Sequence, residues 1–173
     1  FDDLGMSGAV VQMIAHGFVS AAMFLCIGVL YDRMHSREIA SYGGVANAMP
    51  KFAAFAILFA MANAGLPGTA GFVGEWMVIL SAVGFNFWVG LAAASALIFG
   101  AAYTLWMVKR VYLGDVANDG VAKLADINAR EFVMLTLLAV AVLAMGVYPK
   151  PMTDVINPSV ELLLQHVAQS KLI

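Results

Sequence analysis

The sequence has 173 residues, of which 62% are hydrophobic and only 12% are charged, and its net charge is −2. A water-soluble domain needs more surface charge than this, so the composition favours an integral membrane protein. The sequence has no basic run interleaved with aromatic residues, which argues against nucleic acid as a partner. Its single cysteine, Cys26, has no second cysteine with which to form a disulfide or a CxxC metal motif.

The first apolar segment covers residues 8–30, which contain no aspartate, glutamate, lysine or arginine. A helix of this length spans roughly 30 Å of hydrocarbon, so we predict a first membrane span here. Ahead of it the chain begins FDDLGMSG, without an initiator methionine or a basic segment that leads into a short apolar run. We therefore expect no signal peptide, and we expect this start to lie inside a longer chain.

A polar, turn-rich loop is predicted at residues 31–51, followed by a second apolar stretch at residues 52–82. GLPGTAG, residues 65–71, interrupts that stretch, which is too long for one upright helix. Glycine and proline at this density break a helix, and the freed backbone groups need partners inside protein or a hydrated cavity. We predict a discontinuous helix that faces the bundle interior, with a simple proline kink as the alternative. The residues expected at the break are Gly65, Pro67, Gly68 and Gly71.

Two further spans are predicted at residues 88–108 and 132–148, the second of them ended by Pro149 and Pro151. Beyond them, residues 159–169 place valine and leucine at i, i+3, i+4 and i+7 with polar residues between. This spacing predicts a short amphipathic helix at the membrane interface. The predicted fold class is therefore all-α and integral to the membrane, with four transmembrane helices and a broken second one.

The basic residues predict the orientation of the spans. The loops at residues 31–51 and 109–130 share one side of the predicted bundle and hold seven lysines and arginines, whereas the rest of the chain holds two. The positive-inside rule therefore places both loops in the cytoplasm.

Glu75 is the first candidate for a functional residue. It is the only ionisable residue between Lys51 and Tyr103, and it follows directly after the predicted break. A carboxylate in hydrocarbon costs several kcal/mol, so it must face the interior, be protonated, or have a cationic or hydrated partner. We expect Glu75 to take up and release protons in the outer half of the membrane; a purely structural ion pair is the alternative.

His16 lies near the middle of the first span, with Gln12 and Ser20 four residues before and after it. An imidazole can accept a proton on one nitrogen and release another, and these neighbours can hold relay waters beside it. The alternative is a packing histidine with one interhelical hydrogen bond. Tyr103 and Lys109 are further candidates for a polar path along the third span, but packing is the favoured explanation for Tyr103 and interfacial anchoring for Lys109. The three histidines show no ligand spacing, so we expect no metal site.

The chain is similar to the subunit M family of NADH-quinone oxidoreductase, respiratory complex I. The similarity rests on three strings: QMIAHG at residues 12–17, GLPGTAGFVGEWM at 65–77 and YPKP at 148–151. The resemblance covers nearly the whole chain. It implies that residues 1–173 are the C-terminal part of a proton-conducting, antiporter-like helix bundle with two inverted repeats, each containing a broken helix. It also implies that His16 is a histidine on the central proton axis and that Glu75 is the terminal acid of the second repeat. Related antiporter subunits usually carry lysine where Glu75 stands.

The resemblance implies a proton-translocating subunit of a complex I in a bacterial inner membrane. Its partners would be other membrane subunits, namely antiporter-like neighbours and a lateral helix, together with the lipid bilayer. We expect no cofactor and no redox catalysis in this chain, since NADH, FMN, iron-sulfur clusters and quinone would bind partner subunits. The alternatives are an Mrp-type cation/proton antiporter subunit, a membrane-bound hydrogenase subunit, and a structural membrane fragment that conducts nothing.

Overall fold

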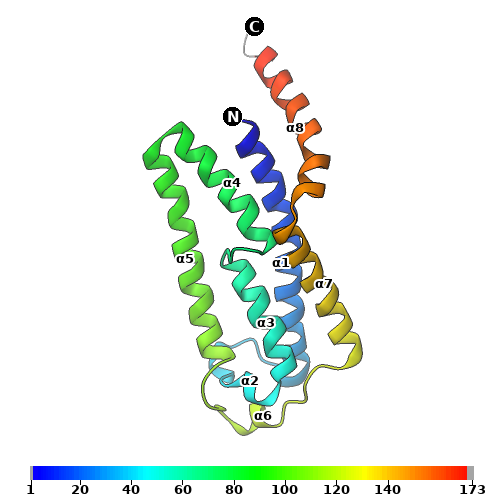
Figure 1. Cartoon of the computed structure of the whole chain (residues 1–173). Coiled ribbons are helices and arrows are strands. Elements are labelled where there is room, and N and C mark those ends of the chain that lie inside the picture. The colour runs from blue at the N-terminus through cyan, green and yellow to red at the C-terminus, as the bar shows by residue number, and fades with distance from the viewer. Residues whose placement is uncertain (1, 171–173) are drawn as a thin grey trace.

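The computed structural model describes residues 2–170 and shows a bundle of helices that run roughly alongside one another (Figure 1). The elements in chain order are α1 (Asp3–Met34), η1 (Ile39–Ser41), α2 (Val45–Ala48), α3 (Pro50–Asn63), α4 (Ala70–Phe85), α5 (Phe87–Val111), α6 (Asp119–Ala122), α7 (Ala129–Val147) and α8 (Lys150–Ser170).

The predicted membrane fold is confirmed, with longer helices than the sequence pattern indicated. Within residues 2–170, α1, α5 and α7 are long and apolar enough to cross a membrane, and α3 and α4 are shorter apolar helices in line with each other (Figure 1). The first span extends to Asp3–Met34 because Asp2 caps its start, accepting a hydrogen bond of 2.9 Å from the Gly5 N–H. Asn86 caps α5 in the same way, and Asn128 begins α7 with a capping box.

The C-terminal amphipathic helix is longer than predicted. It begins at Lys150 rather than near residue 159, and it continues through Pro158. Helix α7 ends at Val147, shortly before Pro149, as predicted. Pro151 does not end it, because this residue falls in the first turn of α8, where a missing N–H is tolerated. Ile156 and Val160 pack against α1 beside Val11, and the last turns of α8 project beyond the bundle (Figure 1).

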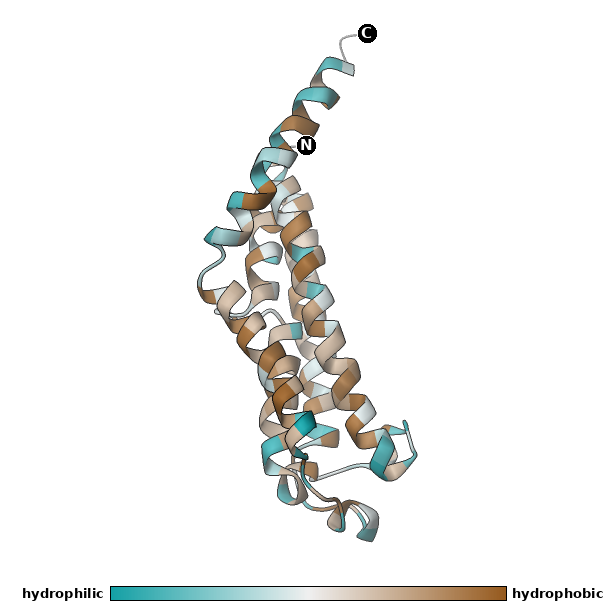
Figure 2. Ribbon diagram, turned by 90° about the vertical axis from the view of Figure 1, so that its right-hand side faces the viewer, coloured by the Kyte–Doolittle hydropathy of each residue, from teal (hydrophilic) through white to brown (hydrophobic). Residues whose placement is uncertain are grey.

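Helix α3 is the centre of the core. Phe52 and Phe59 are fully buried there, between α1, α5 and α7. The outward faces carry large apolar side chains instead, among them Phe24 at 73% exposure, and Figure 2 shows apolar ribbon along the bundle with hydrophilic segments concentrated in the connecting loops and α8. Apolar outer faces are what a bilayer solvates, so the chain is an integral membrane protein.

An ion pair fastens the end of the bundle that carries the basic loops. The Arg33 guanidinium donates to both carboxylate oxygens of Glu131, at 3.0 and 2.8 Å, and also to the backbone carbonyls of Val29 and Ala125. The Asp126 carboxylate next to this pair accepts the first N–H groups of α3. Arg33, counted above among the basic loop residues, therefore lies in the last turn of α1 and joins α1 to α7.

Candidate functional site: the helix break and the Glu75 cavity

The break between α3 and α4 separates two distinct helices. The chain leaves helical geometry between Asn63 and Ala70, and Gly65 and Gly68 adopt left-handed conformations with φ of 80° and 91°. Residues with a Cβ rarely adopt this conformation, which explains two glycines at these positions. The predicted discontinuous helix is thus confirmed over a simple kink.

Gly71 lies within the first turn of α4 rather than in the break itself. A Cβ at this position would lie 3.0 Å from the carbonyl oxygen of Ala62, so the glycine lets the two half-helices approach closely. On the other side, Gly146 of α7 packs directly on the backbone of Gly68 and Thr69. The α7 backbone therefore covers one side of the break, as interrupted backbone at membrane depth requires, while Leu66 and Pro67 stay exposed on the other.

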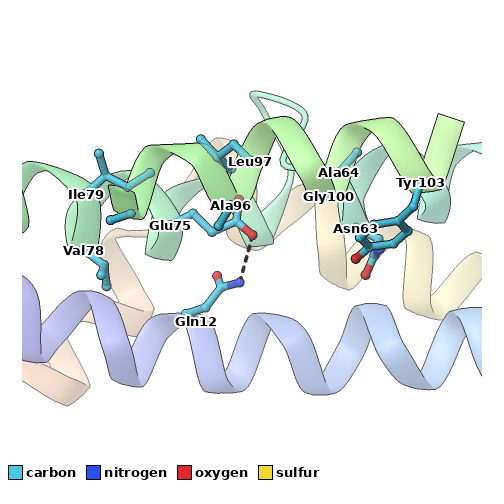
Figure 3. A pocket seen from close by; sticks show the side chains of 11 residues that line it. Gln12, Asn63, Ala64, Glu75, Val78, Ile79, Ala96, Leu97, Gly100 and Tyr103 are labelled. Atoms are coloured by element: carbon cyan, nitrogen blue, oxygen red, sulfur yellow. Dashed lines mark hydrogen bonds between the residues drawn. The ribbon is translucent and has the colours of Figure 1, made fainter. Parts of the chain in front are cut away.

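Close packing of α1 and α4 positions Glu75. A Cβ on Gly74 would lie only 2.7 Å from the backbone nitrogen of Gln12, so a glycine is needed where the two helices touch. The Gln12 side chain reaches across this contact and donates from Nε2 to Glu75 Oε1 at 3.2 Å (Figure 3). Glu75 Oε2 is buried and has no hydrogen-bond partner within residues 2–170, and it lies close to Gly65 at the break.

Glu75 and Gln12 line a cavity of about 250 Å³ between α1, α4 and α5. A water occupies about 30 Å³ in the liquid and needs polar partners, so this cavity is large enough for several waters. Its wall is largely apolar, while Asn63 and Tyr103 supply further polar groups away from the glutamate (Figure 3). The Glu75 carboxyl thus faces a cavity with room for water rather than continuous hydrocarbon.

Two polar residues in this region were missed by the sequence reasoning. Asn63, the last residue of α3, donates its side-chain N–H to Thr104 Oγ1 at 3.3 Å, and Thr104 is only 1% exposed. An asparagine inside an apolar stretch, directly before a glycine- and proline-rich break, is a signal that could have identified the first of them. The threonine gives no such signal, because hydroxyls are common in membrane helices.

Of the other predicted residues, Tyr103 lines the Glu75 cavity, whereas His16, Ser20 and Lys109 lie outside it. His16 lies on the exposed face of α1, where its ring nitrogen Nε2 is 3.0 Å from Ser20 Oγ, and no hydrogen bond joins it to Glu75. Tyr103 lines the cavity although its side chain is 62% exposed. Lys109 is exposed in the last turn of α5 and forms no ion pair with the residues that the structure describes.

The chain was compared with known proteins. A family model described as NADH:quinone oxidoreductase/Mrp antiporter, TM, matches residues 2–100. The chain is 48% identical to NADH-quinone oxidoreductase subunit M of Rhodobacter capsulatus over 94% of its length and 32% of that protein's. It is 43% identical to NADH-ubiquinone oxidoreductase chain 4 of Arabidopsis thaliana, over 94% of this chain and 33% of that one. The chain thus spans about a third of the length of these curated relatives.

Solved structures give the same result for the fold. Respiratory complex I from Thermus thermophilus contains a chain that matches 92% of this one with a TM-score of 0.84 and 30% identity, and the match covers 33% of that chain. The Mrp complex of a Dietzia species shares the fold, with a TM-score of 0.80 at 19% identity over 92% of this chain and 38% of that one. The matched family model and these similarities together show that the chain belongs to the NADH:quinone oxidoreductase/Mrp antiporter family of membrane proteins.

Proposed function

We propose that residues 1–173 form the C-terminal part of a proton-conducting transporter domain in a subunit M of NADH-quinone oxidoreductase. The similarity to subunit M and chain 4 over more than nine-tenths of this chain supports the proposal. The observation that carries it is the Glu75 carboxyl, held by Gln12 at a helix break and lining a cavity with room for water.

In this proposal Glu75 is the group that releases protons towards the outer side of the membrane. It accepts a proton through waters in the cavity, and the hydrogen bond from Gln12 holds its carboxyl at one place during the exchange. His16, which lies on the face of α1 left exposed in this chain, relays protons from the helices of the remaining subunit. Moving one charge against 100 mV costs about 2.3 kcal/mol, so the path must be open to one side at a time.

The partners follow from the same proposal. This chain itself carries no redox cofactor, and NADH, FMN, iron-sulfur clusters and quinone bind other subunits of the complex. Neighbouring antiporter-like subunits and a lateral helix pack against it in a bacterial inner membrane. The loops at residues 31–51 and 109–130 face the cytoplasm, an orientation supported by their basic residues. These loops lie at one end of the bundle, where the Gly44 N–H donates to the carbonyl of Leu113.

The proposal is tested by replacing Glu75 in the complete subunit within its assembled complex. Inverted vesicles that contain Glu75→Gln should pump fewer protons per NADH oxidised, because an amide cannot take up and release a proton. Glu38→Gln is the matched control, since Glu38 is an exposed loop glutamate and its replacement should leave pumping unchanged. An unchanged ratio of protons to electrons in Glu75→Gln would show that this region is scaffold.

A second function is an Mrp-type cation/proton antiporter subunit, which the shared fold and the family description both support. Such a subunit would exchange sodium for protons without NADH. Sodium pulses applied to vesicles that hold the protein would acidify or alkalinise their lumen if it is an antiporter, and would leave the pH unchanged if it is a complex I subunit.

A further inference from the structure

An asparagine at the helix break is tied to a neighbouring helix inside the bundle. Asn63 ends α3, and its Nδ2 donates to Thr104 Oγ1 of α5 at 3.3 Å. Thr104 is only 1% exposed within this chain, and any further part of the subunit can only add to that burial. The contact between Asn63 and Thr104 therefore belongs to this chain alone.

The hydrogen bond to Thr104 uses only one end of the Asn63 amide. Asn63 Oδ1 accepts no hydrogen bond from residues 2–170, and the side chain lines the same cavity as Glu75 (Figure 3). An amide oxygen has two lone pairs and binds water as an acceptor. Thr104 therefore holds Asn63 at the cavity wall, where its oxygen can accept a hydrogen bond from water.

The Glu75 carboxyl has an oxygen in the same position. Gln12 donates to Oε1, but Oε2 is buried and has no hydrogen-bond partner within residues 2–170. A Cβ on Gly65 would lie only 2.6 Å from Oε2, and Asn63 precedes this glycine by two residues, or roughly 7 Å of chain. Buried acceptors in proteins are nearly always paired with a protein donor or an ordered water. Two oxygens that need donors thus belong to side chains that line one cavity, and a single water has two hydrogens to donate.

We infer that Asn63 is a positioning residue for proton transfer to and from Glu75, an inference that rests on the function proposed above. The Asn63 amide holds a water that donates one hydrogen to Asn63 Oδ1 and the other to the Glu75 carboxylate. This water passes a proton to Glu75 and takes another from the next water in the cavity, so it ends the step as water. Gln12 fixes one oxygen of the carboxyl, and the water on Asn63 serves the other.

Variants of the contact between Asn63 and Thr104 test this role in the complete subunit within its assembled complex. Asn63→Leu keeps the shape of the side chain and removes both polar ends, so it should lower the protons pumped per NADH to the value of Glu75→Gln. Thr104→Val removes the hydroxyl that holds the amide and should lower the ratio partway, whereas Thr104→Ser, which keeps the hydroxyl, should pump as wild type. Thr136→Val is the matched control, because the hydroxyl of this α7 threonine is buried without a hydrogen-bond partner within residues 2–170.

An infrared measurement separates this role from a simple loss of packing. The protonated Glu75 carboxyl is recorded as an acid-minus-neutral difference band, which requires no turnover and is identified by its loss in Glu75→Gln. The band should move to higher wavenumber in Asn63→Leu and Thr104→Val, because a carboxylic acid with fewer hydrogen bonds absorbs there. Thr104→Ser and Thr136→Val should leave the band in place.

The outcomes distinguish the role of Asn63 from the proposed function. If Glu75→Gln loses pumping while Asn63→Leu keeps the wild-type band and pumping ratio, the inference is overturned and the proposed function stands. If Glu75→Gln pumps as wild type while the band still moves in Asn63→Leu, the water on Asn63 is supported and the proposed function fails. Thr104→Val lies in α5, outside the break, and applies the same test if Asn63→Leu does not assemble.

Discussion

Replacing Gly74 by alanine should separate the two helices that position Glu75. The added Cβ would lie 2.7 Å from the Gln12 nitrogen and 2.8 Å from its Cα, both of them backbone atoms that cannot turn aside. Overpacking of this kind costs about 1 to 3 kcal/mol. Moving α1 away from α4 also lengthens the hydrogen bond between Gln12 and Glu75, which is already 3.2 Å long.

Gly84→Ala is the control, because Gly84 lies in the same helix and a Cβ there meets nothing within 4 Å. Both variants gain helix propensity, so the difference between them measures the contact with Gln12. We expect a lower melting temperature of the complex and fewer protons pumped per NADH in Gly74→Ala only. If the two variants melted and pumped alike, the close approach of α1 and α4 would not be what positions Glu75.

Three other predictions concern the rest of the chain. Arg33→Met should destabilise the subunit by about 3 kcal/mol in denaturant unfolding, because it leaves the Glu131 carboxylate, which is 9% exposed, without its cationic partner. The double variant Arg33→Met with Glu131→Leu should recover most of that loss. Gly146→Ala should cost about 1 to 3 kcal/mol in the same assay, since its Cβ would collide with backbone at the break; stability equal to wild type would contradict that packing. Hydrogen bonds from the Ser81 hydroxyl and a backbone N–H hold the pKa of Asp2 below its usual 3.8. The stability that ionised Asp2 adds to the start of α1 is therefore fully present above pH 3.8 and is lost as the pH falls through the lowered pKa. Ser81→Ala should raise this pKa in a carboxyl NMR titration, and an unchanged value would show that the hydroxyl has no effect.

Local residue preferences explain why the fold and the helix break could be predicted. Glycine and proline disfavour a helix through their own backbone properties, so Gly65, Pro67 and Gly68 predict the break without any knowledge of the fold. The Glu75 carboxyl shortly after them, at membrane depth, predicts an interior position. The pairing of Asn63 with Thr104 could not be predicted in the same way, because it depends on how α3 and α5 lie against each other.

Helical spacing predicts only part of the arrangement of side chains around His16. Residues four apart drift by roughly 40° around a helix, so Gln12 and Ser20 differ by about twice that angle. The structure accordingly turns Gln12 towards Glu75, while Ser20 and His16 pair on the exposed face. Arg33 could not be recognised as an ion-pair partner either, since Glu131 lies 98 positions away in the sequence.

The central claim is that the Glu75 carboxyl gains and loses a proton in each cycle. Infrared difference spectroscopy of the working complex measures this directly through the stretching band of the protonated carboxyl. We predict a turnover-dependent carboxyl band that shifts in Gln12→Leu, which removes the hydrogen bond to Glu75, and that is lost in Glu75→Gln. A band of undiminished size and unchanged position in Glu75→Gln would contradict the account.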